Sequence, residues 1–263
     1  MQLPPIAHQF AFGALLPFTP LAAWQGRRVR RTTPRLPDAT GRARGSVGNG
    51  AATLRIAVIG ESTVSGVGAR THRTGITGQL AQLLARKLGA RVEWRALGQN
   101  GATARRIERL ALAELGDAKL DVAFVAIGVN DVLELTPVSR WRSDVARLCT
   151  LLASRAGAPQ IVFLGLPPMH RFPVLPQPLR AFVGTRAKLL DATLAALARD
   201  KANVLHVPTP LQGPPDFFCE DRFHPSEAGY AFWAAHTVDA VVPALAASGK
   251  SSRPVRAARR RPR

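Results

Sequence analysis

The sequence predicts an α/β fold with a mainly parallel sheet, and two observations support this prediction. From residue 54 onward, short apolar runs rich in β-branched residues alternate with longer segments of helical periodicity. Each helical segment is long enough to form the crossover that two parallel strands require. With 263 residues, 46% of them hydrophobic, the chain can bury one sizeable core with helices on both faces of the sheet.

The alternation predicts five strands and five helices. The strands are expected at residues 54–60, 91–97, 121–127, 160–166 and 203–207. The helices are expected at residues 76–88, 104–115, 138–156, 179–200 and 226–247. Right-handed crossovers place every loop from a strand to the next helix at one edge of the sheet, where open α/β proteins bind their ligands.

Composition divides the chain into four parts. Residues 1–26 contain no Asp, Glu, Lys or Arg and form an apolar amino-terminal arm. Residues 27–53 are basic and rich in Gly and Pro, which predicts a linker. The α/β domain is expected over 54–247, followed by a basic tail at 248–263 that we expect to be disordered.

The amino-terminal arm leaves the question of membrane contact open. Its apolar stretch is interrupted by Pro17 and Pro20 and is shorter than the ~20 residues that a spanning helix needs. Arginines follow this stretch rather than precede it, which is not the pattern of a secretory signal. If the arm enters a membrane, these arginines favour a cytoplasmic main domain. The alternatives are packing on the domain or on a bilayer surface.

The formal net charge of +19 lies mostly in the flanks. Seven arginines and one aspartate occupy residues 1–44, and seven Lys or Arg residues occupy 250–263. The chain has 36 basic and 17 acidic residues in total, so residues 45–249 contain 22 basic and 16 acidic residues. This distribution is typical of solvated tails; contact with an anionic membrane stays open and a nucleic-acid partner is disfavoured.

The two cysteines, Cys149 and Cys219, have no CxxC motif and no paired spacing to histidine. This argues against a structural zinc site or a disulfide framework.

Ser62 follows the first predicted strand directly, in the segment GESTVSG. After the fifth strand the chain supplies Asp221 and His224, a carboxylate and an imidazole three residues apart. A neutral hydroxyl needs an adjacent base to become a nucleophile, and an imidazole held by a carboxylate is such a base. These residues indicate a serine hydrolase; Ser65 is the rival hydroxyl.

An acyl-transfer site also needs donors for the oxyanion of the tetrahedral intermediate. The backbone N–H groups of Ser62 and Gly101 and the side-chain amide of Asn130 are the candidates. Gly98 is an alternative to Gly101. We expect Asp131 only to cap or brace its loop.

These residues resemble four blocks of the SGNH, or GDSL-type, hydrolase superfamily of esterases and lipases. GESTVSG is similar to the first block, and the others are QNGAT with Gly101, IGVND with Asn130, and DRFHPS with Asp221 and His224. The resemblance covers about residues 54–245 and implies a flavodoxin-like three-layer α/β/α sandwich with five parallel strands and no metal or other cofactor. Glu61 departs from the usual Asp, which supports the turn in that family.

The resemblance implies hydrolysis of carboxylic esters of short or medium acyl chains, including lipid-derived ones. Thioester hydrolysis, carbohydrate deacetylation and acyl transfer remain alternatives on the same site, because fold and catalytic residues do not fix the leaving group. A non-catalytic protein that binds membrane or nucleic acid through its basic flanks is the alternative from a different class. The Pro-rich loop at 167–176 is expected to border the site as an acyl pocket or lid, or merely to cover the sheet edge.

Overall fold

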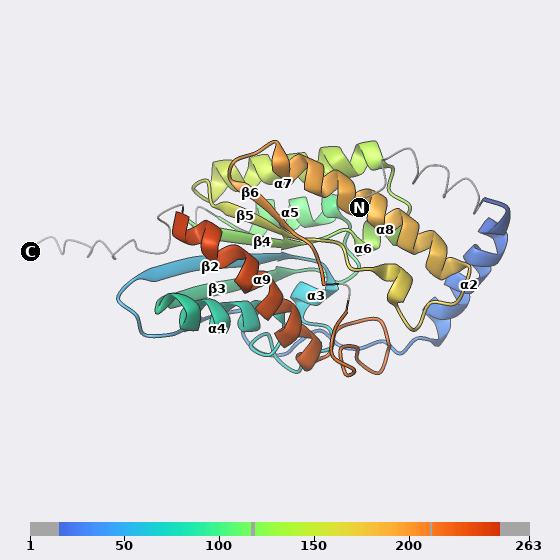
Figure 1. Cartoon of the computed structure of the whole chain (residues 1–263), viewed down its shortest axis with the longest axis horizontal. Coiled ribbons are helices and arrows are strands. Elements are labelled where there is room, and N and C mark those ends of the chain that lie inside the picture. Colours follow the sequence, from blue (N-terminus) through green and yellow to red (C-terminus); the bar gives the residue numbers. More distant parts are fainter. Residues whose placement is uncertain (1–15, 117–118, 211, 248–263) are drawn as a thin grey trace, which may run out of the picture.

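The computed structural model of the chain describes residues 16–116, 119–210 and 212–247. A six-stranded sheet lies between two layers of helices (Figure 1). In chain order the elements are η1 (Leu16–Phe18), α2 (Thr19–Thr32), β1 (Arg44–Val47), β2 (Thr53–Gly60), α3 (Ser62–Ser65), α4 (Ile76–Leu88), β3 (Arg91–Gly98), α5 (Ala104–Glu114), β4 (Val122–Ala126), α6 (Val129–Leu133), α7 (Val138–Arg155), β5 (Gln160–Leu164), η2 (Met169–Arg171), α8 (Leu179–Arg199), β6 (Val204–Val207) and α9 (Glu227–Ala247).

The five predicted strands are confirmed as parallel neighbours. The sheet order is β1-β3-β2-β4-β5-β6, and β2 is paired in parallel with both β3 and β4. All five residues of β4 and of β5 are buried, which is typical of a parallel sheet covered on both faces. The five predicted helices correspond to α4, α5, α7, α8 and α9 to within one residue at each end.

The sheet has six strands rather than the expected five, because Arg44–Val47 adds an antiparallel edge strand to β3. Three of its four residues are exposed, so the segment lacks the apolar pattern that predicts a strand. Gly45 lies against the ring of Trp94, and a Cβ on Gly45 would come within 2.8 Å of that ring. Backbone pairing and this close approach define β1. It lies inside the segment expected to be a linker, and α2 crosses the expected boundary between residues 26 and 27.

Two apolar cores cover the two faces of the sheet, as the alternation along β2 requires. Leu54, Ile56 and Val58 face α4 and α9, where they belong to one cluster with Leu80 and Val238. Ala57 and Ile59 of β2 belong to the second cluster, which includes buried side chains of α5, α7 and α8. Figure 1 shows these two helical layers on opposite sides of the strands.

The topology opens a crevice at the carboxyl end of β2. The chain passes from β2 to β3 on one side and then returns to β4 on the other, so the loops after these strands diverge. Such a switch point is the general ligand site of open α/β sheets.

The structure leaves some expectations untested. Most of the amino-terminal arm and the basic tail lie outside the described residues. In the three ranges that the structure describes, every helix is too short or too polar to cross a bilayer.

Candidate active site

Ser62 begins α3, a single helical turn that follows β2 after Glu61. The turn ends at Gly66, whose φ of +80° is readily adopted only by glycine. Gly60 is required for close approach, because a Cβ there would lie 2.1 Å from the carbonyl oxygen of Ala126 on β4. The tight turn therefore leaves the Ser62 hydroxyl at the carboxyl edge of the sheet.

Ser62, His224 and Asp221 form a hydrogen-bonded chain, although 162 positions separate the serine from the histidine. His224 Nε2 lies 3.0 Å from Ser62 Oγ, and His224 Nδ1 lies 2.5 Å from Asp221 Oδ2. The other carboxylate oxygen of Asp221 accepts the backbone N–H groups of Phe223 and His224, each at 2.9 Å. The carboxylate thus fixes both the imidazole and the loop that carries it.

Asp221 is 2% exposed. Burial alone raises the pKa of its carboxyl group, but the hydrogen bonds from the His224 ring and the two backbone N–H groups favour the carboxylate more strongly. The net pKa of Asp221 is therefore lowered. An ionised Asp221 selects the tautomer of His224 with its proton on Nδ1, which leaves Nε2 free to accept the Ser62 proton.

A seam of contacts between residues 67–74 and 219–230, here called the α9 seam, joins the serine turn to the histidine loop. Tyr230 on α9 donates its buried hydroxyl to the carbonyl oxygen of Val67 at 2.6 Å. Glu227 pairs with Arg70 at 3.1 Å and accepts the hydroxyl of Thr74 at 2.9 Å. Hydrogen bonding with Arg70 lowers the pKa of Glu227 to about 2. These contacts lie just outside the Ser62–His224 pair and hold its two loops together.

Glu61 connects the serine turn to the loop that carries Asn130. Its carboxylate accepts the backbone N–H of Gly128, the backbone N–H of Asn130 at 3.2 Å, and the side-chain amide of Asn130 at 2.9 Å. Burial raises the pKa of Glu61 to about 8, against the opposing effect of these donors. Glu61, a departure from the family's first block, thus keeps a bracing role and also contacts the Asn130 loop of the third block.

Asn130 lies beside the serine turn, but its amide is already engaged. Its Nδ2 atom donates to Glu61 and also, at 3.2 Å, to the carbonyl oxygen of Ala102. Asp131 accepts the N–H of Ala104 at 2.8 Å, at the first residue of α5. Asp131 thus braces the amino-terminal end of α5 against its own loop.

Gly98 and Gly101 differ clearly in their surroundings. A Cβ on Gly98 would meet the backbone nitrogen of Ser65 at 2.2 Å, so this glycine is explained by its packing under α3. Gly101 adopts φ +74° in an open position. Among the described residues, neither the Gly101 N–H nor the Ser62 N–H donates a hydrogen bond within the protein. The rival hydroxyl of Ser65 is buried, away from solvent.

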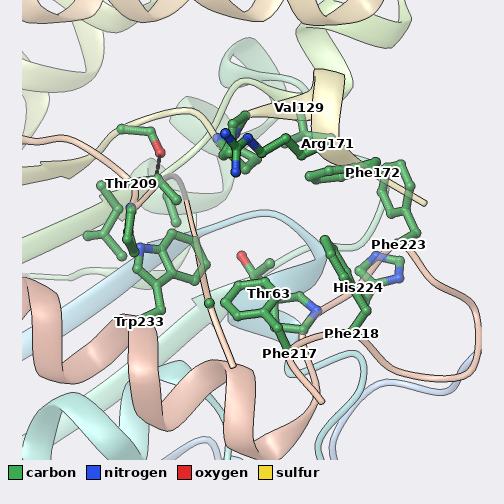
Figure 2. Close-up of a pocket in the computed structure, with 18 of the residues that line it drawn as sticks. Thr63, Val129, Arg171, Phe172, Thr209, Phe217, Phe218, Phe223, His224 and Trp233 are labelled. Atoms are coloured by element: carbon green, nitrogen blue, oxygen red, sulfur yellow. Dashed lines mark hydrogen bonds between the residues drawn. The ribbon is translucent and has the colours of Figure 1, made fainter. Parts of the chain in front are cut away.

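A cavity of about 470 Å³ opens beside Ser62 and His224. Its lining is mainly apolar and comes from the ends of β4 and β5, the loop after β5, the loop after β6, and α9. The lining includes Pro167, Pro168, Arg171 and Phe172, which confirms that the Pro-rich loop borders the site. Figure 2 shows Trp233 and Phe217 at one side of this cavity and Phe172 at the other.

Aromatic rings connect the cavity wall to the histidine. Phe172 makes edge-to-face contacts with Phe218 at 5.4 Å and with Phe223 at 5.0 Å between ring centres. Phe223 in turn contacts the ring of His224 at 5.1 Å. The sequence reasoning missed the part of this wall that follows β6, where the only signal is the adjacent pair Phe217 and Phe218 among prolines.

The other described histidines lie outside the serine–histidine pair. His206 is 2.8 Å from Asp191, which also accepts the N–H of Leu166 at 2.9 Å, so this pair braces β5, β6 and α8. Sequence spacing did not reveal it, because 15 positions separate the two residues. His236 lies 2.9 Å from the carbonyl oxygen of Pro208. No group of three or more His, Cys, Asp or Glu residues in the described ranges is arranged to hold a metal ion.

Solved structures with a similar fold include a carbohydrate esterase and a lipase. A family 3 carbohydrate esterase from Clostridium thermocellum is 18% identical, with a TM-score of 0.55 over 74% of this chain and 98% of the other. The lipase Lip_vut3 from a goat rumen metagenome is 17% identical, with a TM-score of 0.58 over 71% and 97%. TesA is 18% identical, with a TM-score of 0.56 over 73% and 98%. At these identities the likeness establishes the fold. A search of curated proteins found no match.

The sequence itself identifies the family. The model of the GDSL-like Lipase/Acylhydrolase family matches residues 58–232, which span the serine turn, the Asn130 loop and the histidine loop. This chain is thus an ester-hydrolysing enzyme that belongs to the GDSL-like Lipase/Acylhydrolase family.

Proposed function

We propose that the enzyme cleaves carboxylic esters through an acyl-enzyme formed on Ser62. The observation that carries the proposal is the 3.0 Å contact between His224 Nε2 and Ser62 Oγ at the mouth of an apolar cavity. His224 takes the hydroxyl proton as Ser62 attacks the ester carbonyl, and Asp221 stabilises the resulting imidazolium. The imidazolium then gives this proton to the leaving alcohol.

The second half of the reaction uses the same groups. Water loses a proton to His224 and attacks the acyl-enzyme, and Ser62 regains its proton as the carboxylic acid leaves. The N–H groups of Ser62 and Gly101 are available to the oxyanion in both halves. Asn130 becomes the third donor when substrate displaces its 3.2 Å contact with the Ala102 carbonyl, while Glu61 keeps the amide oriented. Catalytic hydrogen bonds commonly reach their final geometry only in the enzyme–substrate complex.

The cavity supports an acyl group of short or medium length, including one derived from a lipid. Its walls are largely Phe, Pro, Leu and Trp side chains, and its volume lies within the ordinary range of small-molecule sites. A sugar ring would leave its hydroxyl groups largely unpaired against this lining, at a cost of roughly 1–3 kcal/mol each. The lining therefore favours acyl recognition over carbohydrate recognition.

The test is hydrolysis of p-nitrophenyl esters of increasing acyl length by the wild type and by Ser62→Ala. We expect kcat/KM to fall at least about a thousandfold in Ser62→Ala, because the nucleophile is lost. Ser65→Ala is the matched control, since the buried Ser65 hydroxyl has no hydrogen-bond partner in the described structure. A fluorophosphonate should label the wild type at Ser62. Equal rates for Ser62→Ala and the wild type would contradict the assignment.

A further inference from the structure

Large exposed apolar side chains gather at the amino-terminal helix. Six such side chains stand out in the described part of the chain, and three of them are Phe18, Leu21 and Trp24, exposed by 51%, 45% and 51%. The other three are scattered over separate elements. A soluble domain commonly exposes apolar residues singly, whereas a cluster indicates an interaction surface.

The same helix is strongly basic. Arg27, Arg28, Arg30 and Arg31 lie in its last two turns, and no acidic residue precedes Asp38 in the chain. Among the described residues, none of these four arginines forms an ion pair. The guanidinium of Arg28 lies 5.5 Å from the centre of the Trp24 ring, so the charged and apolar parts of the surface are continuous.

The opposite face of α2 fixes the orientation of this surface. Ala22 and Gln25 are buried, and Gln25 is bonded at both ends of its amide. It donates to the carbonyl oxygen of Gln177 at 2.7 Å and accepts the N–H of Leu179 at 3.0 Å. Because Ala22 and Gln25 are three residues apart, they share one face of the helix. Leu21 and Trp24 lie one residue earlier, on the adjoining face. The helix is therefore docked on the domain and presents a defined outer face.

The outer face lies near the substrate cavity. The loop that bonds to Gln25 at residue 177 is continuous with Arg171 and Phe172, which line the cavity. In Figure 1, α2 occupies the end of the molecule toward which β2 runs into α3. A surface that holds α2 would thus also be close to the cavity.

We propose that the outer face of α2 docks the enzyme on an anionic lipid bilayer. Leu21 and Trp24 enter the headgroup region, and Arg27, Arg28 and Arg31 bind lipid phosphates. An amphipathic helix with Trp or Leu on one part and arginines on the other has the chemistry of an interfacial helix. A second copy of this chain would meet the same four cations with like charge, whereas an anionic bilayer complements both the charge and the apolar side chains.

The test is co-sedimentation of the full chain with vesicles of phosphatidylglycerol and phosphatidylcholine, and with pure phosphatidylcholine vesicles. The wild type should bind the anionic vesicles, and added salt should weaken binding. We expect partitioning to fall roughly a hundredfold in the charge variant Arg27→Gln/Arg28→Gln/Arg31→Gln. It should fall roughly tenfold or more in the apolar variant Leu21→Ser/Trp24→Ser.

Two control variants match these changes elsewhere on the surface. Leu112→Ser/Leu135→Ser removes two other exposed leucines, and Arg105→Gln/Arg109→Gln/Arg140→Gln removes three other exposed arginines. Both controls should bind vesicles as the wild type does. All variants should keep the wild-type rate on a soluble ester, which separates a failure of docking from a failure of the proposed chemistry.

Three results would overturn the proposal. The first is wild-type binding by both α2 variants, which would assign any lipid contact to another part of the chain. The second is that only the charge variant loses vesicle binding, while the apolar variant binds both vesicles and DNA as strongly as the wild type does. That result would indicate a surface that binds polyanions in general. The third is a dimer without lipid that the apolar variant dissociates, which would assign the face to a second copy.

Discussion

The two sides of the active site are built in different ways. On one side, partly buried hydrogen bonds of 2.5–3.2 Å join Ser62 to His224, His224 to Asp221, and Glu61 to Asn130. On the other side, the apolar cavity is walled largely by Phe and Pro residues from the loops after β5 and β6, which contact each other mainly through apolar surfaces.

This difference suggests that the polar groups determine the reaction, whereas the apolar walls determine which substrate binds. Each polar group has a definite geometric requirement, so replacing one of them should change the rate for every ester. Apolar walls instead tolerate changes of shape and volume, and replacing one of them should change the preference among acyl chains. Four predictions test this division, beginning with the largest expected effect.

The first prediction concerns Asp221→Asn. The amide cannot stabilise the imidazolium and favours the wrong tautomer of His224, so kcat should fall by about four orders of magnitude. Steady-state kinetics on a p-nitrophenyl ester of any acyl length should give the same loss. Glu220→Gln, an exposed neighbour in the same loop, should leave kcat unchanged. A loss below about tenfold in Asp221→Asn would remove Asp221 from the catalytic set.

The second prediction concerns Asn130→Ala. Loss of one oxyanion donor should lower kcat by about a hundredfold or more. The loss should again be uniform across acyl lengths, in contrast to a cavity variant. Urea unfolding must accompany the kinetics, because Glu61 also loses a hydrogen-bond donor in this variant. An unchanged kcat in a stably folded variant would mean that the amide stays bonded to Glu61 and Ala102 throughout the reaction.

The third prediction concerns pH and Glu61. Its pKa rises from an ordinary value of 4.5 to about 8 in the folded protein, so the folded state binds the proton more tightly. The resulting stability is fully present below the unfolded pKa and is lost as the pH rises through the folded pKa. Between about pH 6 and about pH 9, the free energy of unfolding should fall by about 3 kcal/mol through this group. Glu61→Gln should remove that pH dependence. The measurement is urea unfolding of both proteins at several pH values, and an equal change of unfolding free energy with pH in the two proteins would refute the prediction.

The fourth prediction concerns Phe217→Ala, which enlarges the cavity. The ratio of kcat/KM for longer over shorter acyl esters should rise about tenfold, because the removed ring frees space for additional methylenes. Phe232→Ala is the control, since Phe232 contacts the Phe217 ring at 6.4 Å but does not line the cavity. An unchanged acyl-length profile in Phe217→Ala would place the acyl chain elsewhere.

The same division explains how much could be predicted from the sequence. The parallel strands and main helices have strong apolar periodicity. Ser62 closely follows one strand, and Asp221 and His224 lie in the loop between the last strand and the last helix, so their convergence at one edge of the sheet was predictable. The edge strand β1 was not, because its side chains are mostly exposed and its pairing with β3 is made by the backbone. Helix α2 was not recognised either, although Pro20 lies where helices commonly begin.

Long-range packing accounts for the remaining site features. Glu61 was expected to support its own turn, but its contact with the Asn130 loop depends on how β2 and β4 pair, which spacing does not reveal. The cavity wall after β6 likewise depends on Phe172, Phe218 and Phe223 meeting from different loops. The local sequence around these three phenylalanines does not indicate that their side chains contact one another.

The α9 seam has a consequence for how the enzyme loses activity on heating. Helix α9 is the last described element of the chain, and its docking through Tyr230 and Glu227 keeps the imidazole within reach of the serine. Part of this seam is solvent-exposed, and such contacts commonly open at lower free energy than the centre of a sheet does. Inactivation should therefore precede the melting of the strands, and turnover would report the attachment of α9 rather than global unfolding.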